Sequence, residues 1–239
     1  MATATQTVRD IALENPSSIR VFEKLGIDYC CGGRIPLTEA CAAKNLEVDA
    51  VIASLEEAAK TDSPAASDWT RKSLASLAAH IVETHHDYCK RELPRLAALA
   101  QKVVNRHGDT RQELPAIQSK PTGLSEDLTQ HLAKEEFVLF PDIAKLERAI
   151  HDGGAKPRGC FGNVANPITM MTQEHDAAGT LMGEMRQLSQ DFTPPAGACP
   201  TYHALYDGLR EFEQDLQQHV HLENNILFPR AIALDSSTN

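Results

Sequence analysis

Histidine and glutamate recur together in this chain in a pattern that suits metal binding. Two stretches of the form His-x-x-x-Glu each lead into Leu-Phe-Pro, and each follows a His-Asp pair by 44 or 45 residues. The repeat supplies four imidazoles and two carboxylates, a set of N and O ligands that suits a pair of first-row transition-metal ions, iron foremost. The candidate ligands are His86, His131, Glu135, His175, His219 and Glu223.

The spacing within each His-x-x-x-Glu stretch places both side chains on one face of a helix, about 5–6 Å apart. The imidazole can then ligate one ion while the carboxylate, which has two oxygens, reaches toward a second. Glu135 and Glu223 are therefore the expected bridging ligands, with room left for an oxo or hydroxo bridge and an exogenous ligand. Zinc is a weaker alternative, because a structural zinc site closes with four ligands and this set has six. Unrelated buried or surface histidines would not account for a doubled pattern.

The angular position of each histidine around its predicted helix separates these ligands from the other histidines. His86 falls on the apolar stripe of its helix, whereas His85 does not. His221 lies about 200° around the helix from the ligand two residues before it, so it should point away. Asp87 and Asp176 either orient ligands or face solvent, and the sequence leaves both readings open. The remaining histidines are expected at the surface or in loops: His80, His107, His151 and His203.

Four long helices must carry the ligands, because each ligand falls on an apolar stripe with alternating spacings of three and four residues. Such stripes mark the inward faces of a helical bundle, and polar groups on them are costly unless something satisfies them, as a metal centre does. Pro94 is expected to kink or restart the first helix, and Pro141 and Pro229 to end the second and fourth. Connections at residues 101–121 and 151–166 should be surface loops.

The predicted fold class is all-α, in two domains. A small, polar segment at residues 63–68 is predicted to link a small helical domain, residues 1–62, to the four-helix bundle, residues 69–239. A chain of 239 residues is long enough to bury a sizeable core in this arrangement.

Short helices are expected in the first domain from their start and stop signals. Thr7 begins a sequence that resembles a capping box, and Asn15 followed by proline offers a second N-cap. Gly26 is placed to end the helix that follows. An apolar face over residues 48–60 predicts one more helix.

Cys30 and Cys31 are followed by two glycines after an expected helix end, which favours a mobile, accessible loop. A thiolate there could receive iron, pass it to a client protein or exchange with a disulfide. The alternative is a pair of ordinary reduced thiols, small and partly buried, and the residues alone leave both readings open. Cys41 is expected to pack within a helix. Cys160 and Cys199 lie in Gly/Pro-rich segments without an assignable partner.

Composition and charge exclude several classes of function. A net charge of −10 argues against nucleic acid and anionic membrane surfaces as partners. No apolar run is long enough to span a bilayer, and the first ten residues lack the features of a secretory signal. The six cysteines form no spaced disulfide framework, so they are expected to be reduced in a cytoplasmic protein. No motif of a hydrolase is present.

The four-helix repeat of His and His-x-x-x-Glu resembles the hemerythrin-like domain. The N-terminal region, with Asp-Tyr-Cys30-Cys31-Gly-Gly33, resembles the small helical domain of the iron-sulfur cluster repair proteins, the repair of iron centres family. The two resemblances cover nearly the whole chain, and their combination is far more specific than either alone. They imply a carboxylate-bridged, non-haem di-iron centre with four His and two Glu ligands, the six residues that phase and repeat select.

The resemblance further implies a cytoplasmic bacterial protein that restores iron-sulfur clusters damaged by nitric oxide or oxidants by donating iron, with Cys30 and Cys31 assisting the transfer. Its partners would be damaged iron-sulfur proteins, with nitric oxide or O2 as small ligands, and a homodimer stays open. One alternative is an enzyme that reduces nitric oxide or another small oxidant at the two irons. Another is a sensor in which ligand binding at the irons shifts the thiol domain.

Overall fold

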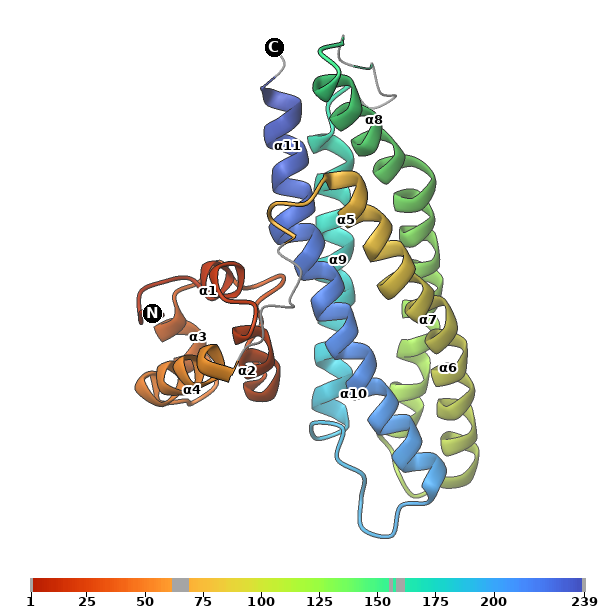
Figure 1. Cartoon of the computed structure of the whole chain (residues 1–239). Helices are drawn as coiled ribbons and strands as arrows, with labels where there is room; N and C mark the ends of the chain where they lie inside the picture. The colour runs from red at the N-terminus through yellow and green to blue at the C-terminus, as the bar shows by residue number, and fades with distance from the viewer. Residues whose placement is uncertain (1, 62–68, 155–156, 158–161, 238–239) are drawn as a thin grey trace.

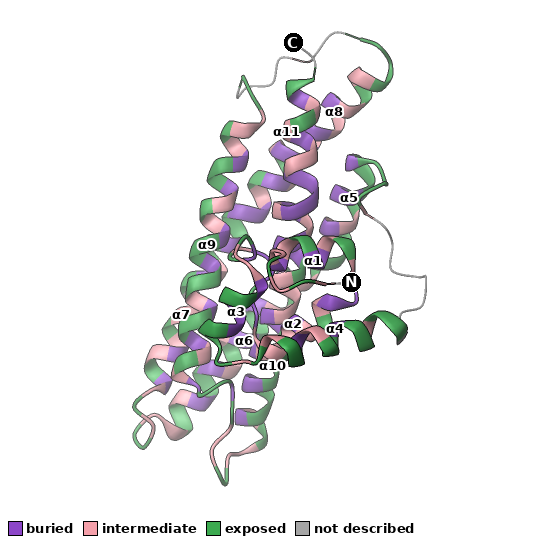
Figure 2. Cartoon of the chain, turned by 90° about the vertical axis from the view of Figure 1, so that its left-hand side faces the viewer, coloured by how far each residue is buried: buried purple, intermediate pink, exposed green. Residues whose placement is uncertain are grey.

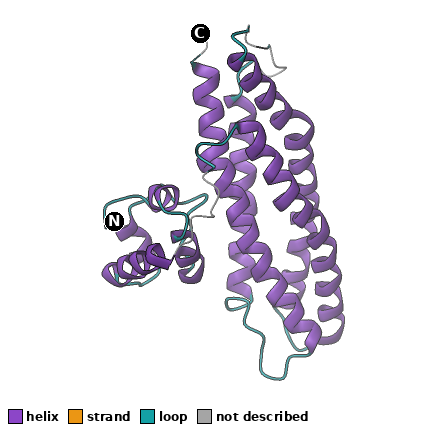
Figure 3. Cartoon of the chain, in the orientation of Figure 1, coloured by secondary structure: helices purple, strands orange, loops and turns teal. Residues whose placement is uncertain are grey.

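The computed structural model describes residues 2–61, 69–154, 157 and 162–237, and the regular elements of this part are helices (Figures 1 and 3). The all-α fold class predicted from the sequence is therefore confirmed. One isolated β-bridge joins Thr7 to Pro36. The segment predicted as a linker, residues 63–68, lies outside the described residues.

Four short helices near the N-terminus pack around a core of their own: α1 (Val8–Glu14), α2 (Ser18–Leu25), α3 (Leu37–Ala43) and α4 (Val48–Thr61). Thr7 caps α1, because its Oγ1 accepts a hydrogen bond from the Asp10 N–H at 3.1 Å. Gly26 ends α2 with a φ of 64°, as expected.

The N-cap predicted at Asn15 is wrong by two residues. The amide oxygen of Asn15 accepts hydrogen bonds from the N–H and the hydroxyl of Ser17, at 3.3 and 2.6 Å. Those bonds hold a turn, so α2 begins only at Ser18.

The larger unit is a bundle of four long rods that lie side by side (Figure 1). The first, second and fourth rods each join two α-helices through a π-helical turn. The third rod is a single helix, α9. The rods are α5 (Leu74–Ile81), η1 (Val82–His86) and α6 (Asp87–His107); α7 (Leu114–Lys134), η2 (Glu135–Leu139) and α8 (Phe140–His151); α9 (Ala165–Leu188); and α10 (Pro200–His221), η3 (Leu222–Leu227) and α11 (Phe228–Ser236).

The prolines do not end these rods where the sequence predicts. Pro141 and Pro229 lie in the first turns of α8 and α11, immediately after a π-helical turn. A proline is tolerated there, because the first N–H groups of an α-helix have no partner within the helix. Pro94 lies within α6, which continues through it to His107 and does not restart.

The loop predicted at residues 101–121 is also wrong. Helix α6 continues to His107 and α7 begins at Leu114, which leaves a much shorter connection. Leu114 and Ile117 are buried in the bundle core, so their packing outweighs the turn signals around them. The second predicted loop agrees with the structure at the described positions between His151 and Ala165.

Two apolar clusters fill the bundle, one around α6, α7, α9 and α10 and the other around α5, α8 and α11. Along each rod the predicted ligands fall between residues of the two clusters, and buried positions recur along the rods (Figure 2). The fold therefore places one polar layer between two apolar ones. Within the described part of the chain, no helix has both the length and the apolar character that crossing a membrane requires.

Candidate metal centre

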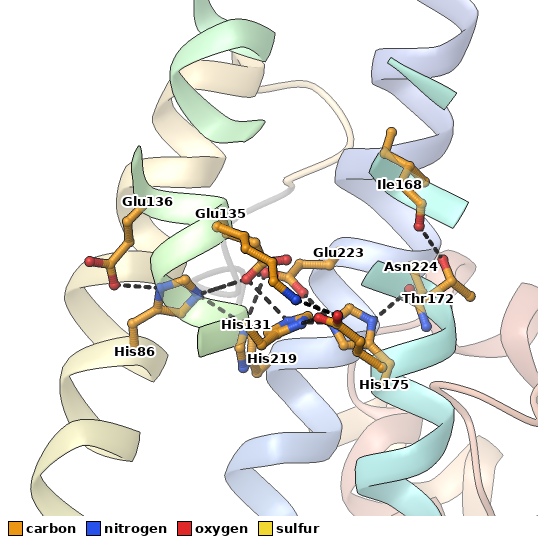
Figure 4. A network of polar contacts seen from close by, with 12 residues as sticks. His86, His131, Glu135, Glu136, Ile168, Thr172, His175, His219, Glu223 and Asn224 are labelled. Atoms are coloured by element: carbon orange, nitrogen blue, oxygen red, sulfur yellow. Dashed lines mark hydrogen bonds and ion pairs between the residues drawn. The ribbon is translucent and has the colours of Figure 1, made fainter. Parts of the chain in front are cut away.

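The six predicted ligands meet at one level of the bundle, with their polar atoms directed toward a common centre (Figure 4). Each is buried, with at most 2% of its surface exposed. They form two groups that share both glutamates, and within each group the ligand atoms lie within 4.8 Å of one another. We call these groups site A (His86, Glu135, His219 and Glu223) and site B (His131, Glu135, His175 and Glu223).

The two imidazoles of each site face each other through their Nε2 atoms. In site A the Nε2 atoms of His86 and His219 are 3.2 Å apart. In site B those of His131 and His175 are 3.0 Å apart. Two Nε2 lone pairs at this distance would repel each other, so each pair of imidazoles needs a proton or a metal cation between its nitrogens.

The two glutamates connect the sites. Glu223 places Oε1 at 2.9 Å from Nε2 of His219 in site A and Oε2 at 3.0 Å from Nε2 of His175 in site B. Oε2 of Glu135 lies 3.3 Å from Nε2 of His131 and 3.5 Å from Nε2 of His86. Each carboxylate therefore faces both sites, the position of a bridging ligand.

Several polar atoms of this layer are buried without a hydrogen bond from the described residues. They include both carboxylate oxygens of Glu135 and Oε2 of Glu223. A buried carboxylate oxygen without a hydrogen bond is costly, and a coordinated cation satisfies it. The donor set of four imidazoles and two carboxylates therefore fits a pair of transition-metal ions.

The electrostatics of the layer favour bound cations. Burial lowers the pKa of His131, but the charge of the nearby Glu135 carboxylate outweighs burial and raises that pKa to about 9. Burial also raises the pKa of Glu223, yet the charge of His219 and the contact with His175 hold it well below its usual range. These shifts favour an ionised Glu223 and a protonated His131. Metal ions would displace that proton on binding.

Three of the four imidazoles are also held from behind. Their Nδ1 atoms contact an acceptor on a neighbouring helix at 2.8, 2.8 and 3.0 Å: Glu136 for His86, Glu174 for His131 and Asn224 for His175. Such a contact fixes the Nδ1–H tautomer and leaves the Nε2 lone pair free for a metal.

These acceptors were not predicted from the sequence. A signal was present, because Glu136 and Asn224 each directly follow a shared glutamate in the two copies of the repeat. Of the two readings left open for Asp87 and Asp176, the structure favours solvent, since both residues are exposed.

Two further histidines are buried beside the site without joining it. Nδ1 of His85 lies 2.9 Å from Oδ1 of Asp215 on α10. The ring of His221 points away from the ligand layer, as expected, and meets the ring of Tyr29 edge-on at 5.4 Å between centroids. The N-terminal helices therefore cover this face of α10.

The other four histidines lie in helices, not in loops. His151 and His203 are exposed, as predicted for surface residues. His80 and His107 are only half-buried, because each ring packs against an aromatic neighbour. None of the four approaches the ligand layer.

The segment with the two adjacent cysteines is held in place, which contradicts the mobile loop predicted from its glycines. The carboxylate of Asp28 accepts hydrogen bonds from the N–H groups of Cys30, Cys31 and Gly32, at 2.9, 3.0 and 2.9 Å. A Cβ at Gly33 would lie 2.7 Å from the carbonyl oxygen of Tyr29. Gly33 therefore allows two backbone segments to approach closely, which is a different role from flexibility.

The two thiols differ in their surroundings. Cys30 is buried, and the hydrogen bond to Cys31, burial and the charge of Asp28 raise the pKa of its thiol well above the ordinary value. Cys31 is half-buried and lines a cavity of about 460 Å³ between the N-terminal helices and α9 and α10. His175, a predicted ligand of site B, lines the same cavity. The Sγ atoms of the two cysteines are 3.8 Å apart.

The other described cysteines pack within the two units. Cys41 is buried on α3, as predicted, and Cys89 is buried in the bundle core. Cys199 has a neighbour that the sequence did not indicate, because its Sγ lies 3.3 Å from Nε2 of His107. Cys160 lies outside the described residues.

Two family models match the chain. Residues 4–59 match a domain of unknown function, DUF542, and residues 77–231 match the hemerythrin HHE cation binding domain. The second match spans all six residues of the ligand layer, from His86 to Glu223.

Several relatives are similar to the chain along its length. The iron-sulfur cluster repair protein YtfE of Yersinia pseudotuberculosis serotype O:1b (strain IP 31758) is 38% identical over 227 residues, which cover 95% of this chain and 96% of the relative. The protein of the same name from Pectobacterium carotovorum subsp. carotovorum (strain PC1) is 38% identical over 232 residues, or 97% and 99% of the two chains. This chain therefore belongs to the iron-sulfur cluster repair protein family, with a hemerythrin HHE cation binding domain.

Proposed function

We propose that this chain repairs damaged iron-sulfur clusters and that it holds two non-haem iron ions for the purpose in sites A and B. Its relatives carry the name of that repair activity. The observation that supports the metal most directly is the pair of buried, shared carboxylates, Glu135 and Glu223, whose oxygens include three without a hydrogen bond from the described residues. The four histidines would hold the ions, Glu135 and Glu223 would be shared between them, and the ions would supply exchangeable iron and redox chemistry.

Iron donation is the form of repair that the site supports best. The ligands His86, His131, His175 and His219 are neutral donors once deprotonated, so each ion depends on the shared carboxylates for charge balance. Such an ion can be transferred when a client offers thiolates, which bind iron strongly.

Cys30 and Cys31 are proposed to assist that transfer. Cys31 and His175 line one cavity, which is large enough for a small ligand such as nitric oxide or O2 and lies beside both the thiols and site B. A thiol that can ligate iron therefore lines the same cavity as a predicted metal ligand.

The first experiment measures metal content and Mössbauer spectra of the full chain purified without added metal. Two irons per chain, exchange-coupled, are expected. One zinc per chain, or no metal, would contradict the proposed centre.

The second experiment follows the recovery of a [4Fe–4S] enzyme inactivated by nitric oxide, with this chain as the sole iron source. Cys30→Ser/Cys31→Ser should lose repair while keeping the di-iron spectrum. Unchanged repair would remove the thiols from the proposal. Catalytic consumption of nitric oxide in the presence of a reductant, without iron transfer, would favour the reductase alternative.

A further inference from the structure

The two copies of the ligand repeat are related residue by residue, and so are the groups behind the ligands. Glu136, one residue after the first bridging glutamate, contacts Nδ1 of His86, and Asn224, one residue after the second, contacts Nδ1 of His175. Glu174, one residue before His175, contacts Nδ1 of His131. By the same relation, the residue one before His86 should support His219.

That residue is His85, and it does not provide the acceptor. Nδ1 of His219 is buried and makes no hydrogen bond with any described residue. The ring of His85 lies parallel to that of His219, with 5.7 Å between centroids and 4° between planes, so it stacks and does not accept. Its own Nδ1 is directed to Asp215 at 2.9 Å.

The ligands of the two sites are otherwise balanced. Both sites share Glu135 and Glu223. In each site a glutamate that pairs with a lysine contacts one histidine: Glu136 with Lys90, and Glu174 with Lys134. The supports differ at the second histidine of each site, where His175 has the amide oxygen of Asn224 and His219 has no acceptor among the described residues. Outside the ligand layer, the cavity that Cys31 lines borders His175 of site B.

We propose that site A is the weaker of the two sites and that its ion is the one released to a client. The inference rests on the proposed function and deepens it by assigning the transferable iron. A histidine whose Nδ1–H is unsupported is less basic at Nε2 and less fixed in orientation, and loss of such support costs about 10- to 100-fold in metal affinity. His85 is thus a positioning residue whose identity keeps site A weak.

The test uses the full chain loaded anaerobically with two ferrous ions and mixed with an excess of a chromogenic chelator. The wild-type chain should release one iron about 10- to 100-fold faster than the other. His85→Glu restores the acceptor that the repeat predicts, so the fast phase should slow toward the slow one. Glu174→His removes the acceptor from His131, so the slow phase should accelerate, whereas Glu174→Gln, which keeps an acceptor oxygen, should retain most of the slow rate.

A spectroscopic readout identifies the site independently of rates. Chelation of the first iron followed by refilling with ⁵⁷Fe labels the released position alone. The Mössbauer quadrupole splitting of that label should change in His85→Glu and stay unchanged in Glu174→Gln. A label that responds to Glu174→Gln and not to His85→Glu would overturn the assignment.

The outcomes separate this inference from the function on which it rests. A wild-type chain that binds two irons and releases both at one rate overturns the inequality of the sites and leaves the di-iron centre intact. A chain that does not bind two irons overturns the proposed function itself. Far-UV circular dichroism of each variant shows whether it folds. If His85→Glu does not fold, His85→Gln serves as a second variant with an acceptor oxygen.

Discussion

Asn225 donates a hydrogen bond through Nδ2 to the backbone carbonyl oxygen of Tyr29, at 3.0 Å, and so joins the bundle to the N-terminal helices. Both ends of this contact are close to functional positions in sequence. Asn225 lies two residues after Glu223, in η3, and Tyr29 directly precedes Cys30. The segment that carries the shared carboxylate of Glu223 therefore also holds the segment that carries the thiols.

Asn225→Ala should destabilise the full chain by about 1–3 kcal/mol, because the buried carbonyl of Tyr29 would lose its donor. Denaturant unfolding monitored by circular dichroism measures the change in free energy. Gln218→Ala is the matched control, since it removes an exposed contact between the same units, Gln218 Nε2 to Glu23 Oε1 at 2.9 Å. The control should change stability by less than about 0.5 kcal/mol. Equal effects of the two variants would contradict the role assigned to Asn225.

Glu223→Gln should lower the iron content from two per chain to one or fewer. The amide keeps the shape of the side chain but loses the negative charge that faces both sites. Elemental analysis of the purified variant measures the change. Asp176→Asn is the control, because Asp176 is exposed although it directly follows His175, and it should retain two irons. Full iron content in Glu223→Gln would argue against a bridging carboxylate.

Cys30 should react slowly with iodoacetamide at neutral pH. Its hydrogen bond to Cys31, its burial and the charge of Asp28 raise its pKa well above the ordinary value of 9.0, and only the thiolate is nucleophilic. The folded chain therefore holds Cys30 as a thiol near pH 7, and its labelling rate should increase with pH without a plateau below pH 9.0.

Mass spectrometry of peptides labelled across a pH series measures that profile. Asp28→Asn removes the charge but keeps an acceptor oxygen for the loop, so it should shift the profile toward lower pH. A plateau near pH 7 in the wild-type chain would show that Cys30 is already a thiolate.

Gly208→Ala should destabilise the bundle by about 1–3 kcal/mol through overpacking. A Cβ at Gly208 on α10 would lie 2.8 Å from Cδ2 of Leu96, which is buried, and 2.8 Å from Nη2 of Arg95. Gly183 on α9 provides the control, because a Cβ there meets no heavy atom within 4 Å among the described residues. Gly183→Ala should stabilise the helix by about 0.5–1 kcal/mol. Thermal denaturation of the metal-free variants should therefore give shifts of opposite sign.

The ligand layer was predictable because its ligands lie close together in sequence within each motif and because the motif occurs twice. A His-x-x-x-Glu stretch fixes two side chains on one helical face, and the repeat links two such stretches, so the sequence alone brings His131 to Glu135 and His219 to Glu223. The structure brings the same six residues together. That they bind iron stays a proposal.

Other features depended on contacts between segments that are distant in sequence. His221 and Asn225 are buried because the N-terminal helices cover them, and no periodicity within α10 indicates that cover. The π-helical turns could not be predicted from the sequence for a different reason. A stripe that alternates between spacings of three and four residues absorbs one extra residue without losing its pattern.

Each π-helical turn sets the phase between the ligand layer and the apolar residues beyond it. Glu135–Leu139 holds one residue more than an α-helix of the same rise would need. If the same residues formed an α-helix instead, the two sides of the rod would rotate against each other by about 100°. Phe140, Ile143 and Leu146 would then leave the core, or the ligands would leave their layer. Deletion of one residue within the turn should therefore return the rod to α-helical geometry with the phase of its two sides kept.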